Sequence, residues 1–493
     1  MTHAPRVALI PLDERPVNTG LVRDVAAIAG TRLRIPPQVL LPNFREPGDV
    51  AGLADWLTTA APELDAAIVS IDTLVHGGLI PSRTSGDLPS VVVSRLDVLR
   101  DLHVAHPALR IAAVNVVMRA SDSYSAVEEP DYWSTTGREL HELGGAVHRA
   151  WWGADAGEPT LDDGIRFDYA RRRLRNHLVG LTSLGLSWEG VLDPLIITAD
   201  DTATWSAGSA EQSILEYWQR LRGGTRVLVY PGADETGAVL AARVLLDGTG
   251  SAPRVAVMPG EPAGMELVPA YENVPLTESV SRQLSALGAS QADGVDDADL
   301  VLVVHTPDPD RGDHFGAEPT PDPAAVDATR RAVAAGLATG LPVALADLRY
   351  GNGGDIALVD ALAAEGVLGR LEAYAGWNTA GNALGSVLAL ALAATSGRRT
   401  GHLDEAARVR ALRRRLVDDA LYQARLRSRF ARELFDDRIE PVEADARARA
   451  EIVLTAELRS AVADLLPGEA VAAVTLPWAR SFEVDVRFES ETE

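Results

Sequence analysis

Short apolar runs alternate with longer helix-like stretches almost to the end of the chain, and this alternation constrains the fold most. Most of the runs are continuously apolar and rich in β-branched residues, as expected for strands covered on both faces. Strands that alternate with helices are typical of βαβ units. The sequence therefore predicts an α/β fold of Rossmann-like parallel sheets. The expected strands are residues 7–12, 66–71, 111–117, 195–198, 226–230, 254–258, 300–305, 343–346 and 371–374.

The length of 493 residues is too great for one simple core, so two or three packed lobes are expected. We predict an N-terminal α/β lobe over residues 1–190, with an aromatic and acidic insertion at 132–163. A middle α/β lobe spans 191–295 and a third spans 296–400. Residues 401–493 are predicted to be mostly helical and to end in a strand. Within them, Arg413-Arg414-Arg415 predicts a solvated helix face.

The charge balance and the absence of cysteine exclude several classes of function. The chain has 46 basic and 70 acidic side chains, a net charge of −24, so neither nucleic acid nor an anionic membrane is expected as a partner. Without cysteine there is no disulfide, zinc–thiolate site, iron–sulfur cluster or thiol nucleophile. The N-terminus lacks a signal-peptide core, and the apolar run 383–394 is too short to span a bilayer. A cytoplasmic protein is expected.

Polar and charged residues follow nearly every predicted strand. In open parallel sheets, ligands bind beyond the carboxyl ends of the strands. A single acid there can simply cap a helix, as Asp201 or Asp355 could, but acids at five strand ends indicate a site. Neighbouring acids on one strand point in different directions, so one of each pair should face the site. The predicted substrate-binding residues are Asp13, Glu14, Arg15, Asn18, Asp72, His76, Arg83, Arg119, Tyr350, Trp377, Asn378 and Asn382.

Three acids, Asp201, Asp234 and Glu235, are the predicted catalytic residues. Two carboxylates from different strands push each other's pKa values apart, which creates an acid and a base or nucleophile. The same oxygens could instead hold a divalent cation such as magnesium or manganese, and no other cofactor is expected. No Gly-x-Ser-x-Gly elbow, Walker loop, dinucleotide fingerprint or paired-histidine motif is present.

Trp377-Asn378 lies at a predicted strand-to-helix turn. Asn378 and Asn382 are four residues apart, which predicts that both amides share one helix face. A tryptophan face for stacking, with amides and carboxylates for vicinal hydroxyls, is typical of a sugar site, although a structural network could also hold these amides. His305 and His314 flank a Pro-Asp loop and are expected to contribute from a lid.

Six motifs occur in one order along the chain and together resemble the bacterial domain-of-unknown-function family 4127, over residues 7 to about 487. This resemblance implies a bacterial protein of about 500 residues with a Rossmann-like α/β build, and it implies no activity. The motifs are Ile10-Pro11-Leu12-Asp13-Glu14-Arg15-Pro16-Val17-Asn18, Gly77-Gly78-Leu79-Ile80-Pro81-Ser82-Arg83, Asp200-Asp201-Thr202, Tyr230-Pro231-Gly232-Ala233-Asp234-Glu235, Gly376-Trp377-Asn378-Thr379-Ala380-Gly381-Asn382 and Leu476-Pro477-Trp478-Ala479-Arg480-Ser481-Phe482-Glu483.

The leading hypothesis is that the chain is a hydrolase for a small, sugar-like polar substrate. A specific form would be an exo-acting glycosidase that recognises a terminal N-acetylhexosamine or a similar sugar, as N-acetylhexosaminidases do. One acid would protonate the leaving oxygen and a second would act as nucleophile or base. Two alternatives stay open at this point. The first is a metal-dependent phosphate or amide hydrolase, and the second is a non-catalytic cytoplasmic protein that binds a small solute. The sequence does not indicate an oligomeric state.

Overall fold

The computed structural model describes residues 4–154, 157–200, 203–224, 226–250, 252–315, 319–435 and 441–491. The chain forms two compact units, which are described separately. Unit 1 comprises Met1–Arg23, Thr31–Val244 and Tyr271–Asn273. Unit 2 comprises Asp24–Gly30, Leu245–Ala270 and Val274–Glu493.

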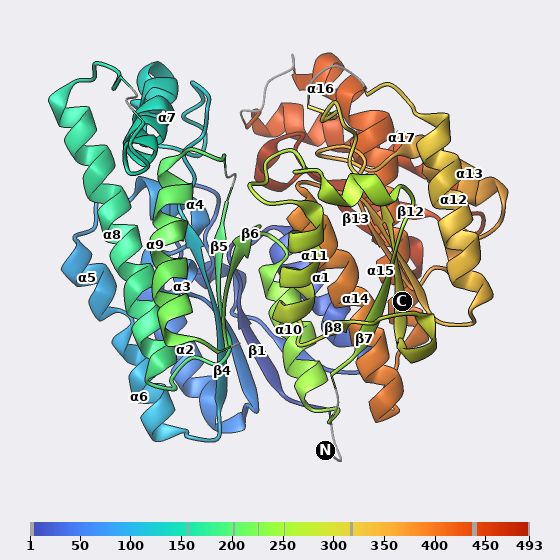
Figure 1. Ribbon diagram of the computed structural model, residues 1–493, viewed down its shortest axis with the longest axis horizontal. Coiled ribbons are helices and arrows are strands. Elements are labelled where there is room, and N and C mark those ends of the chain that lie inside the picture. Colours follow the sequence, from blue (N-terminus) through green and yellow to red (C-terminus); the bar gives the residue numbers. More distant parts are fainter. Residues whose placement is uncertain are drawn as a thin grey trace. The chain divides into compact units, whose positions relative to one another are not determined.

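Unit 1 is built on a six-stranded sheet with the order β2-β1-β3-β4-β5-β6, in which every pairing is parallel (Figure 1). All carboxyl ends therefore lie along one edge, where ligands bind in sheets of this kind. The strands are β1 (Val7–Ile10), β2 (Leu33–Arg34), β3 (Ala66–Ser70), β4 (Arg110–Val117), β5 (Leu195–Ala199) and β6 (Val227–Pro231).

Helices cover both faces of this sheet. On one face, α2, α3, α6, α8 and α9 enclose a hydrophobic core with the strands, and α1 and α10 lie on the other (Figure 1). The helices are α1 (Pro16–Ile28), α2 (Val50–Ala60), α3 (Ile71–His76), α4 (Leu79–Thr84), α5 (Pro89–Ser94), α6 (Asp97–Ala105), α7 (Trp133–Ala150), α8 (Asp163–Trp188), α9 (Ala207–Arg222) and α10 (Thr236–Asp247).

Unit 2 contains a second parallel sheet, with the order β11-β10-β9-β7-β8, and a separate antiparallel pair, β12–β13. The neighbouring strands β9, β10 and β11 are buried along their whole length and mostly apolar, as expected where helices cover both faces, whereas β7 is partly buried and β8 is exposed. The strands are β7 (Arg254–Pro259), β8 (Ser290–Gln291), β9 (Leu300–His305), β10 (Val343–Asp347), β11 (Ala373–Ala375), β12 (Val471–Thr475) and β13 (Asp485–Phe488).

The C-terminal helices pack into the core of unit 2. Residues of the π-helix Leu416–Leu426 and of α17 share one hydrophobic cluster with β9, β10 and the β12–β13 pair. The helices of unit 2 are α11 (Leu276–Ala286), α12 (Pro323–Ala338), α13 (Ile356–Ala364), α14 (Ala380–Thr400), α15 (Glu405–Arg415), α16 (Arg427–Phe435) and α17 (Ala444–Leu465).

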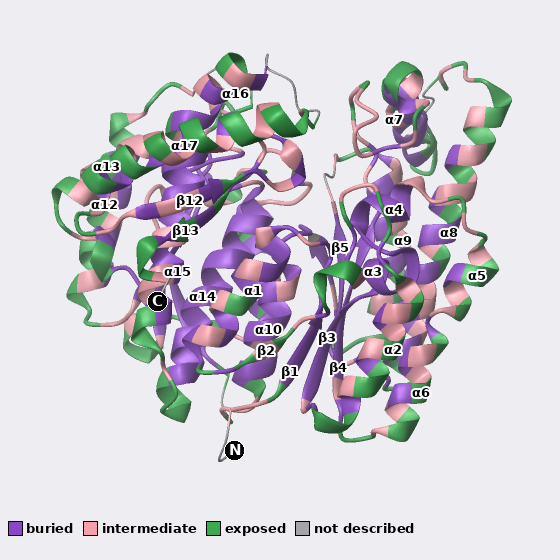
Figure 2. Cartoon of the chain, turned by 180° about the vertical axis from the view of Figure 1, so that it is seen from behind, coloured by how far each residue is buried: buried purple, intermediate pink, exposed green. Residues whose placement is uncertain are grey.

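Helix α14 is the one helix among the described residues that is long and apolar enough to cross a membrane. It has 21 residues, so the helix that contains the apolar run 383–394 is longer than the run, and the prediction that it is too short to span a bilayer is wrong. Its apolar stretch is completely buried (Figure 2). Complete burial is the environment of a core helix in a soluble protein.

The predicted α/β class with parallel sheets and a helical C-terminal region is confirmed, and all nine predicted strands are present. The chain divides differently from the four predicted regions, because β5 and β6 extend the sheet that contains β4, whereas β7 pairs with β9.

The solvated face predicted for the arginine run is wrong for Arg415. Its side chain is buried against Asp418 (2.9 Å) and Asp419 (3.1 Å).

Candidate functional site

Four predicted site residues converge on one buried cluster in unit 1. Arg15 Nη2 lies 2.7 Å from Asp13 Oδ2 and 2.6 Å from Asp234 Oδ1. Asn18 Nδ2 donates to Asp13 Oδ1 (2.9 Å) and to Asp234 Oδ1 (3.3 Å). Asp13 follows β1 and Asp234 follows β6, so one arginine joins acids from two strand ends. The turn before α1 presents Arg15 in this position, because Asp13 Oδ1 also accepts from the Arg15 backbone N–H (3.0 Å).

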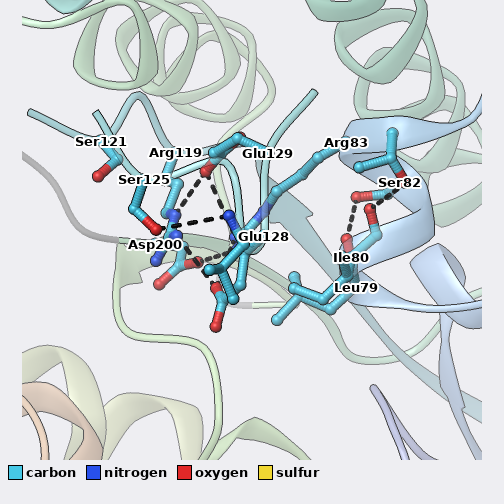
Figure 3. A network of polar contacts seen from close by, with 12 residues as sticks. Leu79, Ile80, Ser82, Arg83, Arg119, Ser121, Ser125, Glu128, Glu129 and Asp200 are labelled. Atoms are coloured by element: carbon cyan, nitrogen blue, oxygen red, sulfur yellow. Dashed lines mark hydrogen bonds and ion pairs between the residues drawn. The ribbon is translucent and has the colours of Figure 1, made fainter. Parts of the chain in front are cut away.

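A second cluster in unit 1 is centred on Arg83 of α4, whose side chain is almost completely buried (Figure 3). Its guanidinium contacts Asp200 Oδ2 at 2.5 Å, Glu128 Oε2 at 3.1 Å and Glu129 Oε1 at 3.6 Å. Arg119 contacts the same two glutamates, at 3.0 Å for Glu128 and 2.8 Å for Glu129. Buried charges require such pairing, because an isolated ion in the interior is very costly.

Solvent reaches only part of this second cluster. The side chains of Glu128, Asp200 and Arg119 are 13%, 18% and 19% exposed, whereas those of Arg83 and Glu129 are at most 3% exposed. The partly exposed groups are one cation and two acids, which can exchange hydrogen bonds with a polar ligand. The buried pair holds them in place.

The two clusters are close enough to interact electrostatically. Burial raises the pKa of Asp234, and the negative charges of Asp13 and Asp200 raise it further. The Arg15 guanidinium and the Asn18 amide act in the opposite direction without cancelling the rise. Asp234 therefore retains a proton more readily than an ordinary aspartate, as a general acid must.

The expectation that only one acid of each neighbouring pair faces the site is met at two strand ends. Asp13 and Asp234 enter the first cluster, whereas Glu14 Oε1 accepts from the backbone N–H of Phe44 (2.9 Å). Glu235 is fully buried, and its Oε2 accepts from the backbone N–H of Ala233 (3.0 Å). Glu235 thus lies in the turn before α10. The third predicted acid, Asp201, lies outside the described residues.

Asp72 and His76, two further predicted site residues, lie on α3 and are buried. Asp72 Oδ2 accepts from the backbone N–H of Val116 (2.8 Å) and from Asn115 Nδ2 (3.3 Å), which fastens α3 to β4. Burial raises the pKa of Asp72 to about 6. Burial also places the pKa of His76 well below its usual value, and neither ring nitrogen has a hydrogen-bond partner in the described parts of the chain.

Unit 2 has its own strand-end acids, and they bind the protein itself. Asp347 Oδ2 accepts from the backbone N–H of Asp355 (2.8 Å) and from the Tyr374 hydroxyl (2.9 Å). Burial raises the pKa of Asp347 to about 6. Asp355 caps α13, as the sequence indicated, and contacts His305 Nε2 at 3.1 Å. His305 is buried against Thr329 (2.7 Å) and so is not part of a lid.

The other predicted residues of unit 2 also lie in structural contacts. Trp377 is 4% exposed and packs edge-on against Phe482. Tyr350 donates its hydroxyl to the Thr320 carbonyl (3.0 Å). His314, predicted in a lid, is buried and contacts the Gly354 carbonyl through Nε2 (3.0 Å).

The predicted helical spacing of Asn378 and Asn382 is wrong, because α14 begins only at Ala380, after its N-cap Thr379. Asn378 precedes the helix with a φ of 68°, and its carbonyl accepts from the backbone N–H of Asn352 (2.9 Å). Asn382 Nδ2 donates to Thr379 Oγ1 (3.1 Å). The two amides therefore do not share a helix face.

Three acids of the Arg83 cluster, Glu128, Glu129 and Asp200, were not among the predicted site residues. Each follows the end of a central strand, β4 or β5, so the same strand-end rule applies to them. Their pairing with Arg83 was not visible, because 45 or more residues separate the partners. In the described residues no group of three or more His, Asp or Glu side chains is arranged to hold a metal ion.

Comparison with curated proteins and with solved structures finds no match. A family model does match, and it covers residues 7–487, nearly the whole chain. That family is described as "Protein of unknown function (DUF4127)". The chain belongs to this family.

Proposed function

We propose that this protein is a hydrolase for a sugar-like polar substrate, with Asp234 and Asp200 as its paired carboxylates. One observation carries the proposal. The two acids follow different strands of the unit 1 sheet, and the charge of Asp200 helps to raise the pKa of Asp234. Glycosidases divide acid and base roles between two such carboxylates.

In this proposal Asp234 donates a proton to the leaving oxygen, because its pKa is raised. Asp200, whose carboxylate Arg83 contacts at 2.5 Å, acts as the base that activates water or as the nucleophile. The reaction breaks the bond between the anomeric carbon and the leaving oxygen. A hydroxyl from water ends on the anomeric carbon and a proton on the leaving group.

Arg119 and Glu128 are the proposed substrate-binding groups, because both are charged, partly exposed and fixed by buried partners. A guanidinium donates to ring or hydroxyl oxygens, and a carboxylate accepts from hydroxyls. An exo-acting enzyme that removes one terminal sugar, including an N-acetylhexosamine, is the specific form we propose. We also propose that the protein acts in the cytoplasm.

A panel of 4-nitrophenyl glycosides, including the N-acetylhexosaminides, tests the proposal with the full chain. The wild type should release nitrophenol from at least one member, and Asp200→Asn should abolish this release. Glu63→Gln is the matched control, because Glu63 forms an exposed pair with Arg34 and should be dispensable. No release from any glycoside would count against the proposal.

Two further arms separate the alternatives. Activity lost on dialysis against a chelator and restored by magnesium or manganese would identify a metal-dependent hydrolase. A ligand that raises the melting temperature without forming product on long incubation would identify a binding protein.

A further inference from the structure

A long loop of unit 1 joins β4 to α7 and carries three charged members of the Arg83 cluster. Its residues, 118–132, are all described and form neither helix nor strand. The three members are Arg119, Glu128 and Glu129 (Figure 3). Loops of this length without secondary structure are uncommon in compact proteins and are usually functional. The positions of the three side chains therefore depend on what holds the loop backbone.

Arg45 holds the end of the loop that carries the two glutamates. Its Nη1 lies 2.6 Å from the carbonyl oxygen of Ala126, 3.1 Å from that of Val127 and 2.9 Å from that of Glu129. These carbonyls lie on both sides of Glu128 in the chain. Hydrogen bonds from a cation are stronger than neutral ones, so one guanidinium fixes the backbone around Glu128.

The turn that carries Arg45 is itself fixed. Its ends, Asn43 and Glu46, exchange two backbone hydrogen bonds of 3.0 Å. Phe44 within it has a φ of 55°, which a residue with a side chain rarely adopts unless its surroundings enforce it. Glu14 Oε1 supports this conformation by accepting from the Phe44 backbone N–H (2.9 Å). Glu14, which follows β1, thus steadies the turn from which Arg45 reaches the loop.

The other end of the loop is held in a similar way. Arg173 of α8 donates to the carbonyl oxygens of Met118 (2.7 Å) and Arg119 (3.0 Å). Both carboxylate oxygens of Glu211 hold the Arg173 guanidinium in turn, at 2.6 Å and 2.8 Å. Guanidinium groups from outside the loop therefore bind its backbone at both ends.

The position of the loop controls contacts inside the cluster. Glu128 Oε2 lies 3.1 Å from Arg83 and 3.0 Å from Arg119. Arg83 in turn contacts Asp200 at 2.5 Å. Hydrogen bonds between nitrogen and oxygen span about 2.7–3.2 Å, so a shift of the Glu128 backbone by about 1 Å would break its contacts.

We propose that Arg45 is a positioning residue, which fixes Glu128 for substrate binding through the backbone of residues 126–129. This inference rests on the proposed function, in which Glu128 binds the substrate and Asp200 takes part in the chemical step. Arg45 acts through the loop and contacts no substrate. Its loss should therefore weaken substrate binding more than it slows the chemical step.

Steady-state kinetics of the full chain on the best nitrophenyl glycoside test the proposal. Arg45→Ala should raise KM about tenfold and lower kcat less than about threefold, because Glu128 binds the substrate. A loss of folded protein alone would lower kcat and leave KM unchanged, and that result would overturn the proposal. Arg45→Lys keeps a cation with three donors and should restore most of the wild-type KM.

A double variant tests the route through Glu128. Because Arg45 acts through this residue, adding Arg45→Ala to Glu128→Gln should raise KM by no more than about twofold. A further full rise would show that Arg45 acts elsewhere. Arg110→Ala is the matched control. Arg110 Nε donates to the Asp193 carbonyl (2.9 Å) at the start of β4, the opposite end of that strand, and its loss should leave KM unchanged.

Hydrogen exchange separates failure of this inference from failure of the proposed function. The backbone amides of residues 119–131 should exchange at least about tenfold faster in Arg45→Ala than in the wild type, and they should not change in Arg110→Ala. If the wild type hydrolyses no glycoside, the proposed function fails, and the exchange rates still decide whether Arg45 holds the loop. Unchanged exchange in Arg45→Ala would overturn the positioning role whatever the activity.

Discussion

Asp13, Asp200 and Asp234 of unit 1 are paired with arginines, whereas Asp347 and Asp355 of unit 2 are hydrogen-bonded to backbone amides, a tyrosine and a histidine. In unit 1, Arg15 and Arg83 each join acids from different parts of the chain. In unit 2, Asp347 and Asp355 accept from backbone N–H groups that follow them, and Asp347 also accepts from Tyr374 of β11. Both patterns follow from the same rule of parallel sheets, so position at a strand end does not by itself distinguish a reactive acid from a structural one.

Exposure separates Asp200 and Glu128 from the other strand-end acids of this comparison, since Asp13 and Asp234 of unit 1 are also buried. Asp200 and Glu128 of unit 1 keep part of their carboxylate surface in solvent, whereas Asp347 and Asp355 of unit 2 are almost completely buried. A substrate can reach the first pair without rearrangement of the protein. The proposed chemistry therefore uses the exposed carboxylate of Asp200, whereas Asp347 and Asp355 anchor the protein's own backbone.

The largest difference should appear in turnover. Asp200→Asn and Asp234→Asn should each lower kcat by about 10²–10⁴-fold, the usual contribution of an acid or base group. Asp347→Asn should keep most of the activity, because the hydrogen bonds of Asp347 in the described residues go to the Asp355 backbone and to Tyr374 of β11, both in unit 2. Initial rates on a glycoside whose leaving group is a sugar measure all three, because such a leaving group needs the proton that Asp234 donates. Loss of turnover in Asp347→Asn to the same extent would break the comparison.

The next largest effect concerns the buried arginine. Arg83→Leu leaves Asp200, Glu128 and Glu129 without their central cation, and it should lower the free energy of unfolding by about 3–5 kcal/mol. Arg6→Leu breaks the exposed pair with Asp65 and should change the free energy of unfolding far less. Urea denaturation followed by tryptophan fluorescence gives both values. Similar losses in the two variants would show that burial of Arg83 has no special importance.

A smaller effect depends on pH and on Asp347. The pKa of Asp347 is raised to about 6 in the folded protein, so between its unfolded value of 3.8 and 6 the folded state binds more protons. Its contribution to stability is present below pH 3.8 and is lost as the pH rises through 6. Relative to Asp347→Asn, the wild type should lose about 2–3 kcal/mol over this range. Parallel stability curves for the two proteins would contradict the raised pKa.

The smallest effect concerns the turn that carries Trp377 and Asn378. Thr379→Ala removes the N-cap of α14, whose hydroxyl accepts from Asn382, and should lower the free energy of unfolding by about 1 kcal/mol. Thr379→Ser should restore the value. Turnover should not change, because the turn is assigned to structure. A fall of kcat/KM without loss of stability would instead place this turn in substrate binding.

Most strands, and several of the polar residues that follow them, could be predicted from the sequence. Continuous apolar runs and the polar residues after them are local features of a sequence. Arg15, Asn18, Asp234 and Arg83 were found in this way. The short strands β2 and β8, of two residues each, carry too little pattern to be recognised.

Pairing between distant residues was not predictable. Arg83 and Asp200 are 117 residues apart, and nothing local indicates that one neutralises the other. The burial of Arg415 was missed for a different reason. Its partners Asp418 and Asp419 are close in the sequence, but these residues become buried only when the C-terminal helices pack into the core of unit 2. The predicted helical position of Asn378 was wrong because α14 begins after Thr379, whose hydroxyl caps the helix.

The central claim is that Asp234 donates the proton and Asp200 acts as the partner carboxylate. The most direct measurement is the pH profile of kcat/KM for Asp234→Asn on two glycosides, one with nitrophenol and one with a sugar as leaving group. Nitrophenol leaves without a proton, so the account predicts near-normal rates for it, a large loss for the sugar, and disappearance of the fall in rate at high pH. Equal losses on both substrates, with the high-pH limb intact, would contradict the account.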